Sequence, residues 1–174
     1  AGDEAFGKRV TEAVTAIIDT PRTAAAVFPE VRAMRDLIAR EKGDADPWDL
    51  KLARGGLTDL DFIAQALTLA YGAQHPALFG HPTETTFLVA REAGLLSEPD
   101  ARLLVDAHKL LGDIFQWQRL TIEGRFDAAT VPPAILKRLA GVADLPNAGV
   151  LLGHLDETRG RVREVFERVL SPQP

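Results

Sequence analysis

The segment of residues 49–65, DLKLARGGLTDLDFIAQ, contains residue types that could bind an anion. Lys51 and Arg54 precede Gly55 and Gly56, and these glycines stand just before the expected start of a helix. The first backbone N–H groups of a helix have no partner within it, and together with the helix dipole they favour an anion such as phosphate. We therefore interpret these four residues as candidate phosphate-binding residues.

A polar stripe continues from this point along the expected helix. Asp61 and Gln65 are one helical turn apart, and Thr58 and Thr68 lie on the same side of an otherwise apolar helix. Unpaired buried polar groups are costly, so the stripe must face another helix, a loop or a neighbouring domain. Asp59 and Asp61 are two residues apart and cannot share one helix face, which disfavours a carboxylate pair that binds a metal.

The same segment also allows a purely structural interpretation. Thr58 is a good N-cap residue, and the helix dipole favours the negative charges of Asp59 and Asp61 in the first turn. Gly55 and Gly56 could form only a turn. The residue types and their spacing leave both interpretations open.

The histidines of the chain predict no metal site. His75 and His81 flank a proline-containing loop, but no third ligand is recognisable, and a metal needs three or four. We expect neither metal ligands nor catalytic residues in this chain.

Apolar residues at helical spacing predict the elements that position these side chains. The expected helices end before Pro21 and at Gly43, run from Thr58 to Gly72 and from Thr83 to Gly94, begin at Ser97, and include Ile135–Leu139 and Leu151–Val169. No charged residue occurs from Phe62 to Thr83, so the helix after Thr58 is expected at the centre of the domain. No strand-like alternation is evident, and the fold class is therefore all-α. We expect an irregular bundle of about six or seven helices.

Length and composition narrow the class of protein. The 174 residues, 46% hydrophobic and 26% charged, suit a single helical domain over residues 1–174. A net charge of −5 argues against nucleic acid and anionic membranes as partners. There is no cysteine and no apolar run long enough to span a membrane, which fits a cytoplasmic protein. Because the chain lacks an initiator methionine, we expect it to be a piece of a longer polypeptide.

The stretch DLKLARGGLTDLDFIAQALTLAYGAQHPAL resembles a signature of the glutamine synthetase adenylyltransferase family, in the helical domain that follows each of that family's two nucleotidyltransferase domains. The stretches VRAMRDLIAREKG, REAGLLSEPDARLLVDAHKLL and RVREVFERVL resemble the same region, so the resemblance covers nearly the whole chain. The resemblance is strongest to the C-terminal copy of this domain, which belongs to the adenylylating half. The matching positions are Asp49, Lys51, Gly55, Gly56, Asp59, Asp61, Phe62 and Gln65. Asp61 departs from the pattern, because the family usually has Glu there.

The resemblance implies a large cytoplasmic bacterial enzyme that transfers AMP from ATP, with Mg²⁺, to a tyrosine of glutamine synthetase. Its other half removes the AMP by phosphorolysis, under control of the PII signal protein and glutamine. The catalytic aspartates of such an enzyme belong to a sheet-containing domain that this chain lacks. We therefore expect the chain to be inactive alone, without a tightly bound cofactor, and to adjoin a nucleotidyltransferase domain.

Our own hypothesis goes beyond the resemblance. Lys51, Arg54 and the two glycines would close over the phosphates of the nucleotide from the side opposite the catalytic domain. With Asp61 and Gln65, they form the set of candidate cofactor-binding residues: Lys51, Arg54, Gly55, Gly56, Asp61 and Gln65.

The alternative is a regulatory module that docks glutamine synthetase, PII or glutamine without chemistry of its own. A polar stripe centred on the helix start favours the companion of a nucleotidyltransferase. An exposed apolar patch away from Lys51 favours the docking module.

Overall fold

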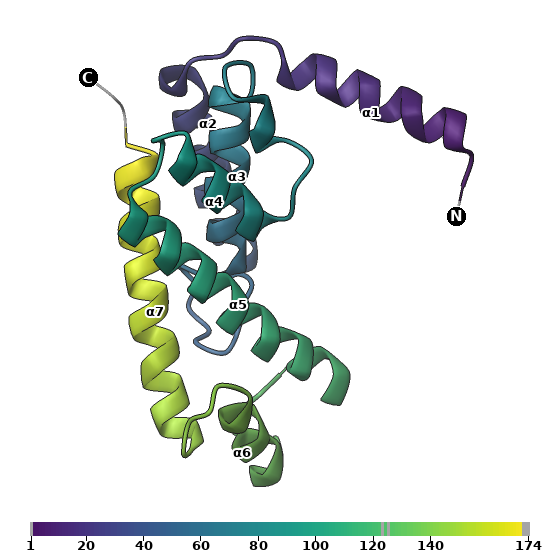
Figure 1. The fold of residues 1–174 in the computed structure, drawn as a ribbon. Helices are drawn as coiled ribbons and strands as arrows, with labels where there is room; N and C mark the ends of the chain where they lie inside the picture. Colours follow the sequence, from purple (N-terminus) through teal and green to yellow (C-terminus); the bar gives the residue numbers. More distant parts are fainter. Residues whose placement is uncertain (1, 123, 125, 172–174) are drawn as a thin grey trace.

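The computed structural model describes residues 2–122, 124 and 126–171, and within these ranges it contains helices and no strand (Figure 1). The predicted all-α class is confirmed. The elements are α1 (Glu4–Ile18), α2 (Ala24–Lys42), α3 (Leu57–Tyr71), the 3₁₀ helix η1 (Pro76–Leu78), α4 (Thr83–Glu92), α5 (Glu98–Thr121), α6 (Pro133–Val142) and α7 (Ala148–Val169).

Helix α3 is the central element of the bundle. It contacts α2, α4, α5 and α7, which surround it in Figure 1. Eight of its fifteen residues are buried, so it has no wide solvent-facing side. The absence of charged residues beyond Asp61 correctly predicted this position.

The helix starts show which capping signals the chain uses. Ser97 was expected to cap α5, and its side chain accepts the backbone N–H of Asp100 at 3.2 Å. The expectation that Thr58 caps α3 was wrong, because α3 begins at Leu57 with Gly56 at the N-cap and no side-chain cap. Thr83, which we also expected to cap a helix, is the first residue of α4, and Pro82 is at the N-cap.

Loop carbonyls replace the missing cap at the start of α3. The backbone N–H of Leu57 donates to the carbonyl of Leu50 at 2.9 Å, and that of Thr58 donates to the carbonyl of Lys51 at 3.1 Å. The connection between α2 and α3, residues 43–56, is therefore irregular but hydrogen-bonded along its length, and Leu50 is fully buried in the core.

The buried face of α2 differs from the predicted one. The spacing of Val31, Met34, Leu37 and Ile38 predicted an apolar stripe, but Met34 and Leu37 are exposed. The face that packs inward is centred on Val27, Phe28 and Arg35 instead. Arg35 is part of this inward face, and its partners are described below.

Helix α1 projects away from the bundle (Figure 1). Ile18, its last residue, is its one buried side chain among the described residues. The rest of α1 carries an apolar stripe exposed to solvent. No helix of the described residues is long and apolar enough to cross a membrane.

Gly55 provides a test of how the connection packs on α7. Its φ of +73° is disfavoured for other residues, and a Cβ there would lie 1.9 Å from the carbonyl oxygen of Arg159. We predict that Gly55→Ala lowers the free energy of unfolding by about 2–5 kcal/mol, measured by urea denaturation followed by circular dichroism.

Gly153→Ala is the matched control. Gly153 lies inside α7 with open space around its Cα, so this change should raise stability by up to about 1 kcal/mol. Equal stability of Gly55→Ala and the parent chain would contradict the close packing of the connection on α7.

Candidate functional site

The side chain of Asp59 ties the candidate segment to two other helices. Asp59 is fully buried in the first turn of α3. Its Oδ1 accepts the Nε of Arg35 from α2. Its Oδ2 accepts the backbone N–H of Gly55 at 2.7 Å and Nη1 of Arg163 from α7 at 3.3 Å. One carboxylate thus joins α2, α3, α7 and the glycine turn.

Arg35 holds the same turn from the other side. Its side chain is almost completely buried, and its Nη2 donates to the carbonyl of Leu52 at 2.9 Å. A buried guanidinium must satisfy its donors, and here the loop carbonyls and Asp59 do so. The loop conformation is therefore an energetic requirement of the buried charges.

Arg159, a residue of α7, holds the beginning of the connection between α2 and α3. Its Nη1 donates to the carbonyl of Pro47 at 2.7 Å, and its Nε donates to the carbonyl of Leu155 at 3.2 Å. Burial lowers the pKa of the Arg159 guanidinium, an effect opposed by the nearby charge of Asp156. Arginine remains charged despite such a shift, so Arg159 is a fixed cation beneath the loop.

The ion pairs continue to the surface through Glu167. It pairs with Arg163 on the same helix and with Arg32 of α2, whose Nη2 lies 2.9 Å from its Oε2. The Arg163 guanidinium also lies 4.4 Å from the ring centre of Phe166. Five charged side chains, Arg32, Glu167, Arg163, Asp59 and Arg35, thus form one network that joins α2, α3 and α7.

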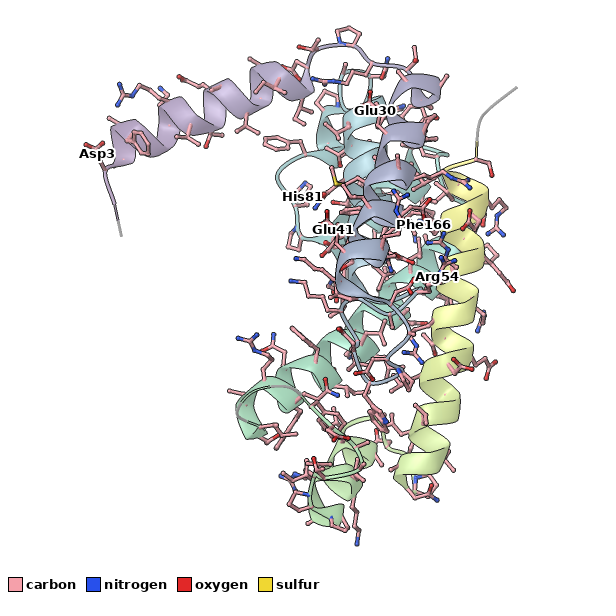
Figure 2. All side chains as sticks on the ribbon, turned by 180° about the vertical axis from the view of Figure 1, so that it is seen from behind. Asp3, Glu30, Glu41, Arg54, His81 and Phe166 are labelled. Carbon is pink, nitrogen blue, oxygen red and sulfur yellow. The ribbon has the colours of Figure 1, made fainter. Side chains whose placement is uncertain are left out.

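A cleft of about 950 Å³ lies between this connection and α7. Arg54 is at its edge, beside α7 in Figure 2, and its Nε donates to Asp44 at 2.8 Å. This hydrogen bond raises the pKa of Arg54. The cleft carries charges of both signs, including Asp44, Arg54, Asp156, Arg159, Arg163 and Glu167. Arg54 thus has an internal partner and does not form part of a purely cationic surface.

The backbone N–H groups at the start of α3, which the sequence predicted to bind an anion, have partners within the chain. The N–H of Gly55 binds Asp59, and those of Leu57 and Thr58 bind loop carbonyls. Gly56 has no room for a side chain, because a Cβ there would lie 2.7 Å from the carbonyl oxygen of Leu50. An anion at this end of α3 would therefore be bound by side chains rather than by the helix start.

Lys51 is the cation of the segment of residues 49–65 that is left available among the described residues. Its side chain is exposed and has no partner among the described residues. Its backbone is held on both sides, since its N–H donates to Oδ1 of Asp49 at 3.1 Å and its carbonyl accepts the N–H of Thr58. A fixed loop thus presents a free ammonium group to the surroundings.

The residues of the predicted polar stripe along α3 lie in different surroundings. Asp61 accepts the hydroxyl of Thr83 at 2.9 Å, and Thr68 donates to the carbonyl of Ala64 at 2.9 Å. Gln65 is exposed and has no partner among the described residues. Asp59 and Asp61 contact different elements, as their spacing predicted.

The six predicted residues do not line one cavity. Arg54 borders the cleft at α7, whereas Gln65 borders two grooves on other sides of α3. Among the described residues, no group of three or more His, Asp or Glu side chains is arranged to hold a metal ion. Sequence reasoning missed Arg35, Arg159 and Arg163, and the signal that could have revealed Arg35 is its position on the apolar face of α2.

Comparison with known proteins identifies the family in which this arrangement occurs. Residues 32–170, which include α3, the connection before it and α7, match a family described as GlnD PII-uridylyltransferase. The chain belongs to this family. The match covers the whole ion-pair network, and it begins within α2, after α1.

Curated relatives are also similar to the chain. It is 36% identical over 166 residues to the "Bifunctional glutamine synthetase adenylyltransferase/adenylyl-removing enzyme" of Rhodopseudomonas palustris (strain BisB5), covering 95% of the chain and 17% of the relative. The protein of the same name from Mesorhizobium japonicum is 39% identical over 172 residues, with 97% and 17% covered. The resemblance to glutamine synthetase adenylyltransferases is therefore confirmed. The chain spans 17% of the length of these relatives.

The buried carboxylate of Asp59 offers a second test. Asp59→Asn leaves Arg35 and Arg163 without its negative charge in a buried site, and we predict a loss of about 3–5 kcal/mol in the free energy of unfolding. The measurement is urea denaturation of the purified variant.

Asp44→Asn is the control for this change. It removes a charge that pairs with the exposed Arg54 and should cost less than about 1 kcal/mol. If both variants lost the same small amount, the network would not be what holds the connection in place.

Proposed function

We propose that the chain is the helical companion of a nucleotidyltransferase domain, in a cytoplasmic enzyme that transfers AMP from ATP to a tyrosine of glutamine synthetase. The family match and the names of the relatives support this proposal. The resemblance of the sequence is best to the helical region of the adenylylating half, and we assign the chain to that half.

The observation that carries the proposal is the presentation of Lys51. In the signature segment, Asp49, Asp59 and Asp61 bind partners within the chain, and the glycines are required by packing. Lys51 is the cation of that segment without an internal partner among the described residues. A lysine held on a fixed loop and left free is suited to bind a group outside the chain.

We infer that this group is a phosphate of the nucleotide. An ammonium group is a strong donor to phosphate oxygens, and such charge-assisted hydrogen bonds are stronger than neutral ones. The described residues offer no donor set for Mg²⁺, so we assign ATP and Mg²⁺ to the nucleotidyltransferase domain. Lys51 would then approach the nucleotide from the opposite side, with Arg54 beside it once its bond to Asp44 opens.

Lys51→Ala tests this role. A charge-assisted hydrogen bond to phosphate contributes about 1.5–3 kcal/mol, so the change should slow adenylylation of glutamine synthetase by roughly ten- to a hundredfold in the enzyme that carries this chain. The melting temperature should not change, because the side chain is exposed. The rate is measured as label transferred from α-³²P-ATP.

Lys109→Ala removes another exposed lysine, on α5, and should leave the rate unchanged. If Lys51→Ala also left the rate unchanged, the signature segment would be a structural turn and the proposed nucleotide contact would be wrong.

The chain by itself should transfer no AMP. Phosphoryl-transfer chemistry needs a metal held by carboxylates, and the described residues provide no such group. We predict no label on glutamine synthetase when the purified chain is incubated with α-³²P-ATP and Mg²⁺. Label at the rate of the complete enzyme would contradict the companion role.

A second candidate function is a regulatory docking module for glutamine synthetase or PII. The observation that favours it is the exposed apolar stripe of α1, which in Figure 1 projects away from the connection between α2 and α3. Titration of the purified chain with each protein distinguishes this function, because a companion domain need not bind either one alone.

A further inference from the structure

Helix α1 carries a row of apolar side chains without a partner. Phe6, Val10, Val14 and Ile17 are 58%, 45%, 37% and 56% exposed. Steps of four, four and three residues place them on one face of the helix. Because Ile18 alone is buried, this face contributes nothing to the core of the bundle.

The apolar row of α1 ends next to Ile18, which borders the bundle. Ile18 borders a groove of about 460 Å³ beside α3, together with Gln65 and Leu69. The last two also border the next groove, of about 320 Å³ between α2 and α3, which reaches the exposed Met34. We call the exposed row of α1 together with these two grooves the docking face, formed by Phe6, Val10, Val14, Ile17, Ile18, Met34, Gln65 and Leu69.

Gln65 connects the docking face to the family signature. It is one of the positions at which the chain resembles the adenylyltransferase family, and it has no partner among the described residues. An exposed signature position without an internal partner is available to contact a group outside the chain.

The charge of α1 argues against a lipid surface. Residues 3–19 contain Asp3, Glu4, Glu12 and Asp19 but only Lys8 and Arg9 as cations. Amphipathic helices that bind anionic membranes carry a basic polar face. The docking face therefore fits a protein.

The length of the relatives points to one protein partner. The chain corresponds to 17% of their length, so most of each relative lies outside the matching region. A partner within the same polypeptide is present at high effective concentration and need not be recruited from solution. A contiguous exposed apolar surface is expected at such an interface.

We propose that the docking face binds the nucleotidyltransferase domain of the same polypeptide, which rests on the proposed function. The partner surface would be apolar and about as long as α1, whose 15 residues extend for roughly 22 Å. An isolated helix of about this length is marginal in water, so docking would also stabilise α1 itself. The same contact would fix the orientation in which the bundle presents Lys51.

Hydrogen exchange tests the proposal on two proteins, the chain alone and the enzyme that carries it. The amides of α1 should exchange rapidly in the chain alone and at least about tenfold more slowly in the enzyme. Val10→Asp/Val14→Asp should abolish this protection in the enzyme and leave the melting temperature of the chain unchanged. Ala5→Asp/Ala16→Asp adds the same charges to exposed alanines on the opposite side of α1 and should preserve the protection.

Equal exchange of α1 in both proteins would overturn the proposal. So would slow exchange in the chain alone with a dimeric mass by light scattering, which would assign the face to a second copy. Protection that appears only when glutamine synthetase or PII is added would assign it to that protein. Because the readout is exchange, a normal rate in Lys51→Ala would refute the nucleotide contact without affecting this result.

Discussion

The buried ion pair between Arg35 and Asp59 is the interaction on which the rest of the structure depends. Two opposite charges without access to water must satisfy each other and bind every remaining donor and acceptor. The loop carbonyls, the Gly55 amide and Arg163 fulfil that requirement. This requirement determines the path of the connection between α2 and α3 and the position of α7 against it.

This arrangement separates structural from available residues in the signature segment. A motif of glycines, carboxylates and cations at a helix start resembles an anion-binding loop, yet most of its polar groups are used internally. The carboxylate of Asp59 is itself the anion that receives the Gly55 amide. The family resemblance therefore conveys two kinds of information, since some positions build the loop and Lys51 and Gln65 face outward.

Local sequence patterns predicted the helices well and their partners poorly. The Ser97 cap of α5 and the charge-free stretch of α3 after Asp61 are each a signal within a single helix, and both led to correct predictions. The ion pairs of Asp59 join residues 24 and 104 positions apart, for which no spacing rule exists. Met34 is exposed because the inward face of α2 is centred on Val27, Phe28 and Arg35, and Arg35 pairs with Asp59 of α3.

The bond between Arg159 and the carbonyl of Pro47 has a consequence for the order of folding. These residues are 112 positions apart, and Arg159 belongs to the last helix. During synthesis, a ribosome releases the connection long before α7 exists to cover it. Because Arg159 and Arg163 belong to α7, the loop that presents Lys51 lacks their hydrogen bonds until α7 has been synthesised. Chains released before α7 is complete would thus lack the fixed loop even when most of the bundle has been made.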